Sequence, residues 1–212
     1  MRRYSFSLAI LLFLNFCKSD IGDVINLPEP QREGGLPLNE ALNNRKAQRD
    51  FDETSRVTPE IISQALWSCY GIREGKSRTV PSATGWYPLL AYVFLEEGVY
   101  KYNPEGHQLV KLFNGDHRSL TGTQTSVVTK ARVNFVFIAD FKKKSSMDGD
   151  DAHKLRSIYL DSGHVTMALS LFAAANNMKG VVRAMVDTDP LLEFLQLNKD
   201  DYIFTIAYSL GY

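Results

Sequence analysis

Two short segments carry the residue types best suited to binding a small ligand. Residues 45–51 have the sequence Arg-Lys-Ala-Gln-Arg-Asp-Phe, which places three basic side chains in five positions. A guanidinium is a planar group that forms paired hydrogen bonds with a phosphate or a carboxylate. Residues 81–88 have the sequence Pro-Ser-Ala-Thr-Gly-Trp-Tyr-Pro, and small residues let a flat ligand approach the backbone closely. Together the segments predict a ligand that is both aromatic and anionic, and flavin mononucleotide (FMN) has both properties.

A third segment opens a long apolar stretch and contains Tyr159, Asp161, Gly163 and His164. With the three segments in this order, the sequence resembles the flavin-dependent nitroreductase superfamily, nearest the small branch that includes the peptide-azoline dehydrogenases. That branch carries the patterns Arg-Arg-Ser-x-Arg-x-Phe, Pro-Ser-Ala-Gly-x-x-Tyr-Pro and Tyr-x-Asp-x-Gly-His. The resemblance covers about residues 36–212.

The resemblance implies that Arg45, Lys46 and Arg49 hold the phosphate, ribityl chain and pyrimidine edge of FMN. Ala47 stands where the family usually has serine, so one hydroxyl contact worth about 1 kcal/mol is absent. Many relatives continue past the last strand to a basic residue that reaches the phosphate, and this sequence ends at Tyr212. Taken alone, residues 45–49 are equally well explained as a solvated helix end, where basic residues are favoured by the helix dipole.

Two further segments are expected at the flavin ring. The resemblance implies that small residues line the ring with their backbone and short side chains: Pro81, Ser82, Ala83, Thr84 and Gly85. Spacing relative to the family places Ala184 and Met185 at the N5 edge of the flavin. Trp86 and Tyr87 either wall the pocket or pack in the core, and the sequence leaves both interpretations open.

Other polar residues of these segments have simpler explanations. Ser82 lacks the surrounding Gly-x-Ser-x-Gly pattern of a hydrolase nucleophile. Asp161 and His164 lie three residues apart on one predicted helix face, but two side chains without a third ligand do not make a metal site. We therefore predict no catalytic side chain and no metal.

In the family that this sequence resembles, the cofactor carries the chemistry and the protein positions it. The resemblance implies hydride transfer from NAD(P)H to flavin N5 and then to a nitroaromatic, quinone or similar acceptor in the same slot, which gives ping-pong kinetics. It also implies a homodimer with flavin at the interface. Two alternatives stay open. One is a non-catalytic relative that binds flavin or another small ligand, and the other is a peptide-azoline dehydrogenase, against which an exported chain argues.

The composition is that of one globular domain. The chain has 212 residues, 44% of them hydrophobic, and its 24 lysines and arginines are balanced by 24 aspartates and glutamates. This balance gives no reason to expect nucleic acid or an anionic membrane surface as a partner.

The start of the sequence has the pattern of a targeting segment. Arg2 and Arg3 precede an apolar run at residues 6–16, which is too short to span a bilayer, and Cys17 follows it. We expect residues 1–17 to be a signal peptide, of the lipoprotein type with a lipid on Cys17 or of the plain secretory type. The chain is then exported, and is either periplasmic or tethered to the membrane through that lipid alone. Residues 18–36, which contain two prolines and two adjacent glycines, are expected to form a linker before a domain at residues 37–212.

The remaining sequence predicts an α+β fold of the nitroreductase type, with a central mixed sheet flanked by helices, in a dimer. The expected helices cover residues 40–46, 59–70, 119–130, 154–177 and 189–197. The expected strands cover residues 90–95, 98–102, 133–139, 180–186 and 202–210, with the first two paired as a hairpin. Residues 165–175 are apolar nearly all round, which predicts a fully buried helix.

Overall fold

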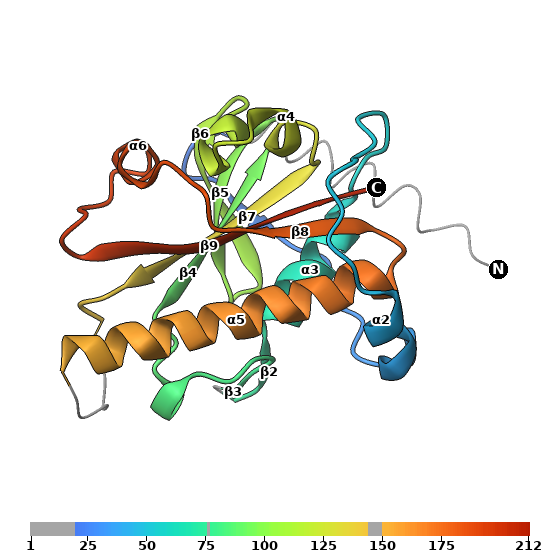
Figure 1. Ribbon diagram of the computed structural model, residues 1–212, viewed down its shortest axis with the longest axis horizontal. Coiled ribbons are helices and arrows are strands. Elements are labelled where there is room, and N and C mark those ends of the chain that lie inside the picture. Colours follow the sequence, from blue (N-terminus) through green and yellow to red (C-terminus); the bar gives the residue numbers. More distant parts are fainter. Residues whose placement is uncertain (1–19, 76, 144–149) are drawn as a thin grey trace.

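The computed structural model describes residues 20–75, 77–143 and 150–212, and the predicted signal peptide lies outside these ranges. The fold is α+β, as predicted, with one large sheet between two helical layers (Figure 1). Seven strands form the sheet: β1 (Val24–Asn26), β4 (Leu89–Leu95), β5 (Gly98–Asn103), β6 (Gln108–Asn114), β7 (Val133–Asp140), β8 (Lys179–Arg183) and β9 (Tyr202–Gly211). Two shorter strands, β2 (Ile72–Glu74) and β3 (Ser77–Arg78), pair separately.

The helices pack against both faces of the sheet. They are α2 (Leu38–Asn44), α3 (Pro59–Tyr70), α4 (Thr125–Val128), α5 (Asp151–Ala175) and α6 (Thr188–Phe194), with the 3-10 turns η1 (Ala83–Gly85) and η2 (Arg118–Thr121). Figure 1 shows α3 and α5 along one face of the sheet and α6 on the other side. None of the helices in the described ranges is long and apolar enough to cross a membrane.

The order of the strands is β1-β6-β5-β4-β7-β9-β8. We expected a mixed sheet, but every pairing in the described part of this sheet is antiparallel. The physical reason is the position of β9. Helix α5 crosses the sheet between β7 and β8, which makes these two strands parallel, but β9 lies between them and runs opposite to both.

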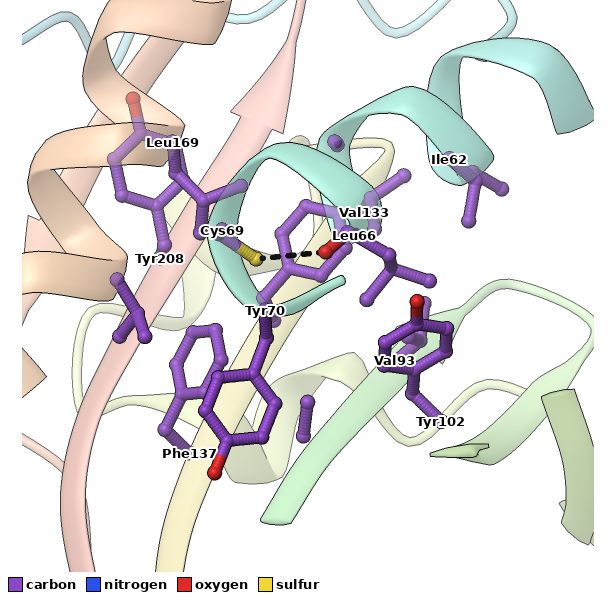
Figure 2. Packing of buried hydrophobic residues seen from close by; sticks show 14 of the residues in the cluster. Ile62, Leu66, Cys69, Tyr70, Val93, Tyr102, Val133, Phe137, Leu169 and Tyr208 are labelled. Atoms are coloured by element: carbon purple, nitrogen blue, oxygen red, sulfur yellow. Dashed lines mark hydrogen bonds between the residues drawn. The ribbon is translucent and has the colours of Figure 1, made fainter. Parts of the chain in front are cut away.

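The central strand β7 divides the core in two, because its side chains alternate between the faces. Phe135 and Phe137 point into the larger cluster, which includes residues of α3 and α5. Val136 and Ile138 point into the cluster beneath α6. Figure 2 shows side chains of α3, α5, β7 and β9 meeting in the larger cluster. This confirms the prediction that residues 133–139 are buried on both faces.

Two helix starts follow from capping residues. The Thr58 side chain accepts a hydrogen bond from the Ile61 N–H, and Pro59 occupies the first turn of α3. The helix ends at Gly71, as predicted. The carboxylate of Asp150 caps α5 in the same way by accepting from the His153 N–H.

Several expected elements differ from the structure. Residues 119–130 do not form one helix, because Gly122 is extended (φ 168°, ψ 155°) and separates η2 from α4. Helix α2 ends before Arg45, so the basic segment is not helical. No helix or strand was expected at residues 108–114, and these residues form β6.

The predicted linker at residues 18–36 is partly folded. Residues 24–26 form β1, which pairs with β6 at the edge of the sheet. Ile25 and Leu27 are 6% and 8% exposed, so their burial explains why this arm is held against the domain. Helix residues 165–175 are also not fully buried, since Met167 is 41% exposed.

Candidate functional site

Strand β8 contacts residues 45–51, one of the segments predicted to bind the flavin, and leads at its far end into another, residues 184–185. The backbone N–H of Gln48 donates to the Gly180 carbonyl at 3.0 Å, and Lys179 Nζ lies 2.9 Å from the Asp50 carboxylate. Phe51 packs against Val181 of β8 in a small buried cluster. Residues 45–51 are therefore fixed beside the strand whose far end leads into residues 184–185.

The predicted binding residues in both segments face solvent. Arg45, Lys46, Ala47 and Arg49 are exposed, and so are Ala184 and Met185, the latter at 70%. Exposed cationic residues thus lie beside the start of β8, and two exposed residues follow its far end.

Arg183 is a residue of this site that the sequence analysis missed. It is the last residue of β8, directly before Ala184, and is only 8% exposed. Its Nη2 donates to the Thr121 carbonyl at 3.3 Å, whereas its Nη1 is buried and has no hydrogen-bond partner. Burial, and then the positive charge of Arg49, lower the pKa of Arg183 to about 10. A basic residue inside an otherwise apolar predicted strand was the signal that could have identified it.

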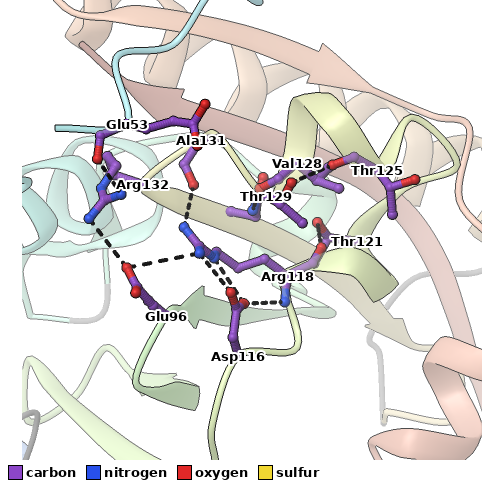
Figure 3. A network of polar contacts seen from close by, with 11 residues as sticks. Glu53, Glu96, Asp116, Arg118, Thr121, Thr125, Val128, Thr129, Ala131 and Arg132 are labelled. Atoms are coloured by element: carbon purple, nitrogen blue, oxygen red, sulfur yellow. Dashed lines mark hydrogen bonds and ion pairs between the residues drawn. The ribbon is translucent and has the colours of Figure 1, made fainter. Parts of the chain in front are cut away.

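The segment that faces Arg183 is held by a second buried arginine (Figure 3). Arg118 is 5% exposed, and its Nη2 lies 2.7 Å from the carboxylate of Asp116. Its Nη1 donates to the Ala131 carbonyl at 3.0 Å, and its own carbonyl accepts from the Thr121 hydroxyl at 2.7 Å. These contacts fix η2, so the Thr121 carbonyl and Gly122 have defined positions against Arg183.

The third binding segment, at residues 81–85, forms a turn with unusual backbone angles. Thr84, Gly85 and Tyr87 have φ values of 51°, 69° and 48°, a region that is costly for residues other than glycine. Ser82 and Ala83 are half-buried, whereas Pro81, Thr84 and Gly85 are exposed. Pro81, Thr84 and Gly85 of this turn are thus open to solvent, and their role at a flavin ring stays a prediction.

A buried carboxylate holds this turn in place. The Ser82 hydroxyl donates to Asp161 Oδ2 at 2.5 Å and accepts from the Tyr87 N–H at 2.8 Å. Asp161 is 4% exposed; its burial raises the pKa of the carboxyl, and the hydrogen bond from Ser82 and the charge of His164 lower it. Trp86 is buried, and its Nε1 donates to the Lys143 carbonyl at 3.1 Å, which favours the core interpretation of this residue.

Within one chain, the turn at residues 81–85 and the helix α2 that precedes the basic segment contact α5 at different places along its length. The turn is attached at Asp161, whereas α2, which leads into Arg45, borders a groove with Ala168 and Phe172. At about 1.5 Å per residue, these attachment points lie roughly 10–16 Å apart along the helix axis. Strand β8 therefore connects the region of residues 45–49 to residues 184–185, whereas the hydrogen bonds of residues 81–85 in the described part of the chain run to neighbouring residues and to α5.

An exposed apolar surface covers the same two helices. Five large side chains on α2 and α5 are 41–64% exposed: Leu38, Leu42, Tyr159, Leu160 and Met167. Exposed apolar side chains grouped on two neighbouring helices favour an interaction surface.

Comparison with known proteins identifies the family of this chain. The sequence profile of the Nitroreductase family matches residues 42–212, which include all three binding segments and the whole sheet except β1. The chain belongs to the nitroreductase family. This membership confirms the resemblance seen in the sequence and the predicted fold, apart from the pairing of the strands.

Two proteins named as nitroreductases are similar to this chain over most of its length. A protein of Methanocaldococcus jannaschii that is named as a nitroreductase is 28% identical over 190 residues, covering 84% of this chain and 93% of that protein. A crystal structure from Ralstonia eutropha, also assigned as a nitroreductase, has a TM-score of 0.80 and 30% identity over 89% of this chain and 88% of its own.

Two more distant structures share the fold. The Escherichia coli microcin synthetase complex McbBCD matches with a TM-score of 0.68 and 16% identity, covering all of this chain and 84% of that one. A nitroreductase-type protein of Desulfovibrio desulfuricans in complex with FMN matches with a TM-score of 0.61 and 16% identity, covering 84% and 87%. At these identities the two structures show that the fold is shared, and membership of the nitroreductase family supports an oxidoreductase.

The residues beside β8 fit FMN. Arg45 and Lys46 are exposed cations suited to a phosphate, and Arg49 and the buried Arg183, which directly precedes the exposed residue Ala184, add positive charge. Bound FMN would supply reversible hydride chemistry, and these residues would bind and orient it.

Proposed function

We propose that this protein is an FMN-dependent oxidoreductase that uses NAD(P)H to reduce a nitroaromatic, a quinone or a similar acceptor by ping-pong hydride transfer. The observation that carries the proposal is the set of exposed cations at residues 45–49, held beside the start of β8, whose far end leads into the exposed residues 184–185. In this scheme Arg45 and Lys46 bind the phosphate, Arg49 binds the pyrimidine edge, and no side chain acts as a catalytic acid or base.

The first test of this proposal is cofactor content. Protein made without residues 1–17 is expected to purify yellow with about one FMN per chain. Arg45→Ala is expected to weaken FMN binding by roughly 1.5–3 kcal/mol, the scale of a hydrogen bond to a charged group. Arg73→Ala, which removes an exposed arginine from β2, is the matched control and is expected to bind FMN as the parent does. Colourless protein that takes up no FMN on reconstitution would refute the proposal.

We also propose that the site is completed in a homodimer, with residues 81–85 supplied by a second copy. The separation of the two attachment points along α5 and the exposed apolar side chains on α2 and α5 support this arrangement. Light scattering is expected to show a dimer, and dissociation is expected to release FMN. A monomer that carries FMN at micromolar concentration contradicts it.

Subunit mixing tests the shared site directly. Arg45→Ala damages the basic segment, and Thr84→Trp blocks the exposed turn. If each site takes one segment from each chain, a heterodimer of the two variants has one intact site and one site with both defects, and it regains up to half of the parent's FMN. If both segments act within one chain, the heterodimer has no intact site and regains none.

Turnover separates the oxidoreductase from a non-catalytic flavin-binding relative, the alternative that Ala47 favours. NADH or NADPH, added without oxygen, is expected to bleach the flavin absorbance, and an added quinone is expected to restore it. Stable FMN binding without bleaching by either nucleotide identifies the binding protein instead.

We further propose that the chain is exported, on the pattern of residues 1–17. Mass spectrometry of the native protein distinguishes the forms. A diacylglycerol mass on Cys17 identifies a lipoprotein, and a free terminus near Ser19 identifies a secreted protein. An intact Met1 in the cytoplasmic fraction refutes export.

A further inference from the structure

A pocket of about 400 Å³ lies at the end of the β4–β5 hairpin opposite its turn. Its apolar part comes from the first residues of β4 and from Val110 of β6, and its polar part from the ends of α3, β3 and β5 and from Lys143. None of residues 45–51 and 184–185 lines it. Its volume is in the range of small-molecule sites, so it is a second place on this chain where a ligand fits.

Arg78 is held in this pocket with one edge of its guanidinium free. The guanidinium carbon lies 4.3 Å from the ring centre of Tyr70 and 4.9 Å from that of Tyr87, and Nη1 donates to the Tyr70 carbonyl at 3.1 Å. No side chain or carbonyl within residues 20–75, 77–143 and 150–212 accepts a hydrogen bond from Nε or Nη2. These two nitrogens form the edge that pairs with both oxygens of a carboxylate.

The hydroxyl of Tyr70 is a further donor without a partner. Tyr70 is 3% exposed and lines the pocket, and its hydroxyl oxygen is buried without a hydrogen bond to any described residue. Figure 2 shows its ring extending from the end of α3 away from Leu66. Burial raises the pKa of Tyr70, so the hydroxyl stays protonated and can donate. Asp161, whose charge also raises this pKa, does not line the pocket and accepts from Ser82.

Positive charge exceeds negative charge around the pocket. Arg78, Lys101 and Lys143 line it, and within the described ranges none of the three forms an ion pair. Lys143 Nζ donates to the Tyr87 carbonyl at 2.6 Å, and burial, followed by the charge of Arg78, lowers the pKa of Lys143. The single acidic residue that lines the pocket is Glu105, which is exposed. An anion would relieve the repulsion between these neighbouring cations.

The geometry points to a second small-molecule site here, which binds a carboxylate carried on an apolar body. The two carboxylate oxygens pair with Nε and Nη2 of Arg78, Lys101 adds charge, and the apolar body lies against Leu89 and Ala91, which are buried at the start of β4. This site is additional to the proposed oxidoreductase function and does not require bound FMN.

Isothermal titration calorimetry with benzoate tests the site, and benzyl alcohol is the uncharged probe of similar size. Benzoate is expected to bind at least about tenfold more tightly than benzyl alcohol, because a bidentate pair with a guanidinium is a strong hydrogen-bonded contact. The preference is expected in protein with and without FMN. Equal affinities for the two probes would overturn the inference. Tighter binding of inorganic phosphate than of benzoate would overturn the assignment to a carboxylate.

Substitutions locate the bound benzoate. Arg78→Met is expected to weaken binding by about tenfold or more, the scale of a lost hydrogen bond to a charged group, and Lys101→Met by a smaller factor. Arg156→Met removes an exposed arginine of α5 that does not line the pocket and is expected to bind as the parent does. Arg45→Ala is also expected to leave benzoate affinity unchanged. A loss in Arg45→Ala with none in Arg78→Met would place benzoate at the basic segment and refute the second site.

Tyr70→Phe covers the case in which Arg78→Met does not fold, since it removes one oxygen and keeps the ring on which Arg78 stacks. It is expected to weaken benzoate binding several-fold, while its Tm stays at or above that of the parent, because the lost hydroxyl is buried without a partner. Unchanged affinity in the folded Tyr70→Phe and Lys101→Met variants contradicts the site. Parent protein that binds benzoate through Arg78 but takes up no FMN supports this inference and refutes the proposed function alone.

Discussion

Ser82→Ala is the most informative single substitution, because one hydroxyl joins the predicted flavin turn to α5. The hydroxyl donates to Asp161 Oδ2 at 2.5 Å and accepts from the Tyr87 N–H at 2.8 Å. Alanine leaves a carboxylate that is 4% exposed without this donor and leaves the Tyr87 N–H without its acceptor. A hydrogen bond to a charged group is worth about 1.5–3 kcal/mol and a neutral one about 1 kcal/mol, so we expect a loss of roughly 2–4 kcal/mol in unfolding free energy.

Urea unfolding at neutral pH measures this loss, and Ser68→Ala is the matched control. Ser68 is half-buried in α3, and its hydroxyl donates to the Ala65 carbonyl at 2.8 Å without bridging to another element. Alanine is also the best helix former, so the control is expected to change stability by less than about 0.5 kcal/mol. Equal stabilities of the two variants would show that Ser82 does not hold the turn.

The pH dependence gives an independent check with a defined sign. Burial raises the pKa of Asp161, and the hydrogen bond from Ser82 lowers it. Without that bond the carboxyl has a still higher pKa in the folded state. The variant's deficit is therefore largest at pH values where the carboxylate is charged, and it shrinks as the pH falls and Asp161 takes up a proton. A deficit that grows on acidification contradicts this assignment.

Three further predictions concern the surroundings of the site. Arg118→Met removes the buried cation of Figure 3 and is expected to cost about 3 kcal/mol in thermal unfolding, whereas Lys130→Met, which breaks an exposed ion pair, is expected to cost less than about 1 kcal/mol. Burial lowers the pKa of His107 from 6.5, so the unfolded chain takes up this proton first. Stability is therefore expected to fall as the pH drops below about 6.5, by at most about 1.4 kcal/mol per pH unit, and His107→Gln is expected to lack that slope in urea titrations. Gly180→Ala places a Cβ atom 2.1 Å from a buried tyrosine hydroxyl of β9 and is expected to cost about 1–3 kcal/mol, whereas Gly163→Ala, which meets nothing within 4 Å, is expected to be neutral or stabilising.

The sequence predicted the elements that have strong local signals. Thr58 and Pro59 defined the start of α3, and the turn at residues 96–98 between two expected strands defined a hairpin that the structure contains. It failed where the decisive contact is distant in sequence. The helix predicted at residues 119–130 is divided at Gly122, and that glycine is needed for Arg183, which lies 61 positions away.

In the candidate site, too, the sequence predicted what depends on local residue types and missed what depends on contacts between distant residues. The residue types at 45–49 and 81–85 pointed to ligand binding, but the roles of Asp161 and Arg183 depend on tertiary burial. Asp161 was interpreted as structural, and it is, because it holds Ser82. Arg183 interrupts an apolar segment of the sequence, but only the structure shows that it is buried with an unpartnered nitrogen and lies near another arginine.

The position of β9 governs how the domain is assembled during synthesis. Residues 202–211 supply the strand that joins β7 to β8, so a nascent chain keeps both strand edges unpaired until almost all of the domain has been made. Open edges of apolar strands are prone to pairing with other chains, and contacts between distant segments form slowly. Premature termination before residue 202 would thus leave the basic segment and β8 detached from the rest of the sheet, and the candidate site would form only in chains that contain β9.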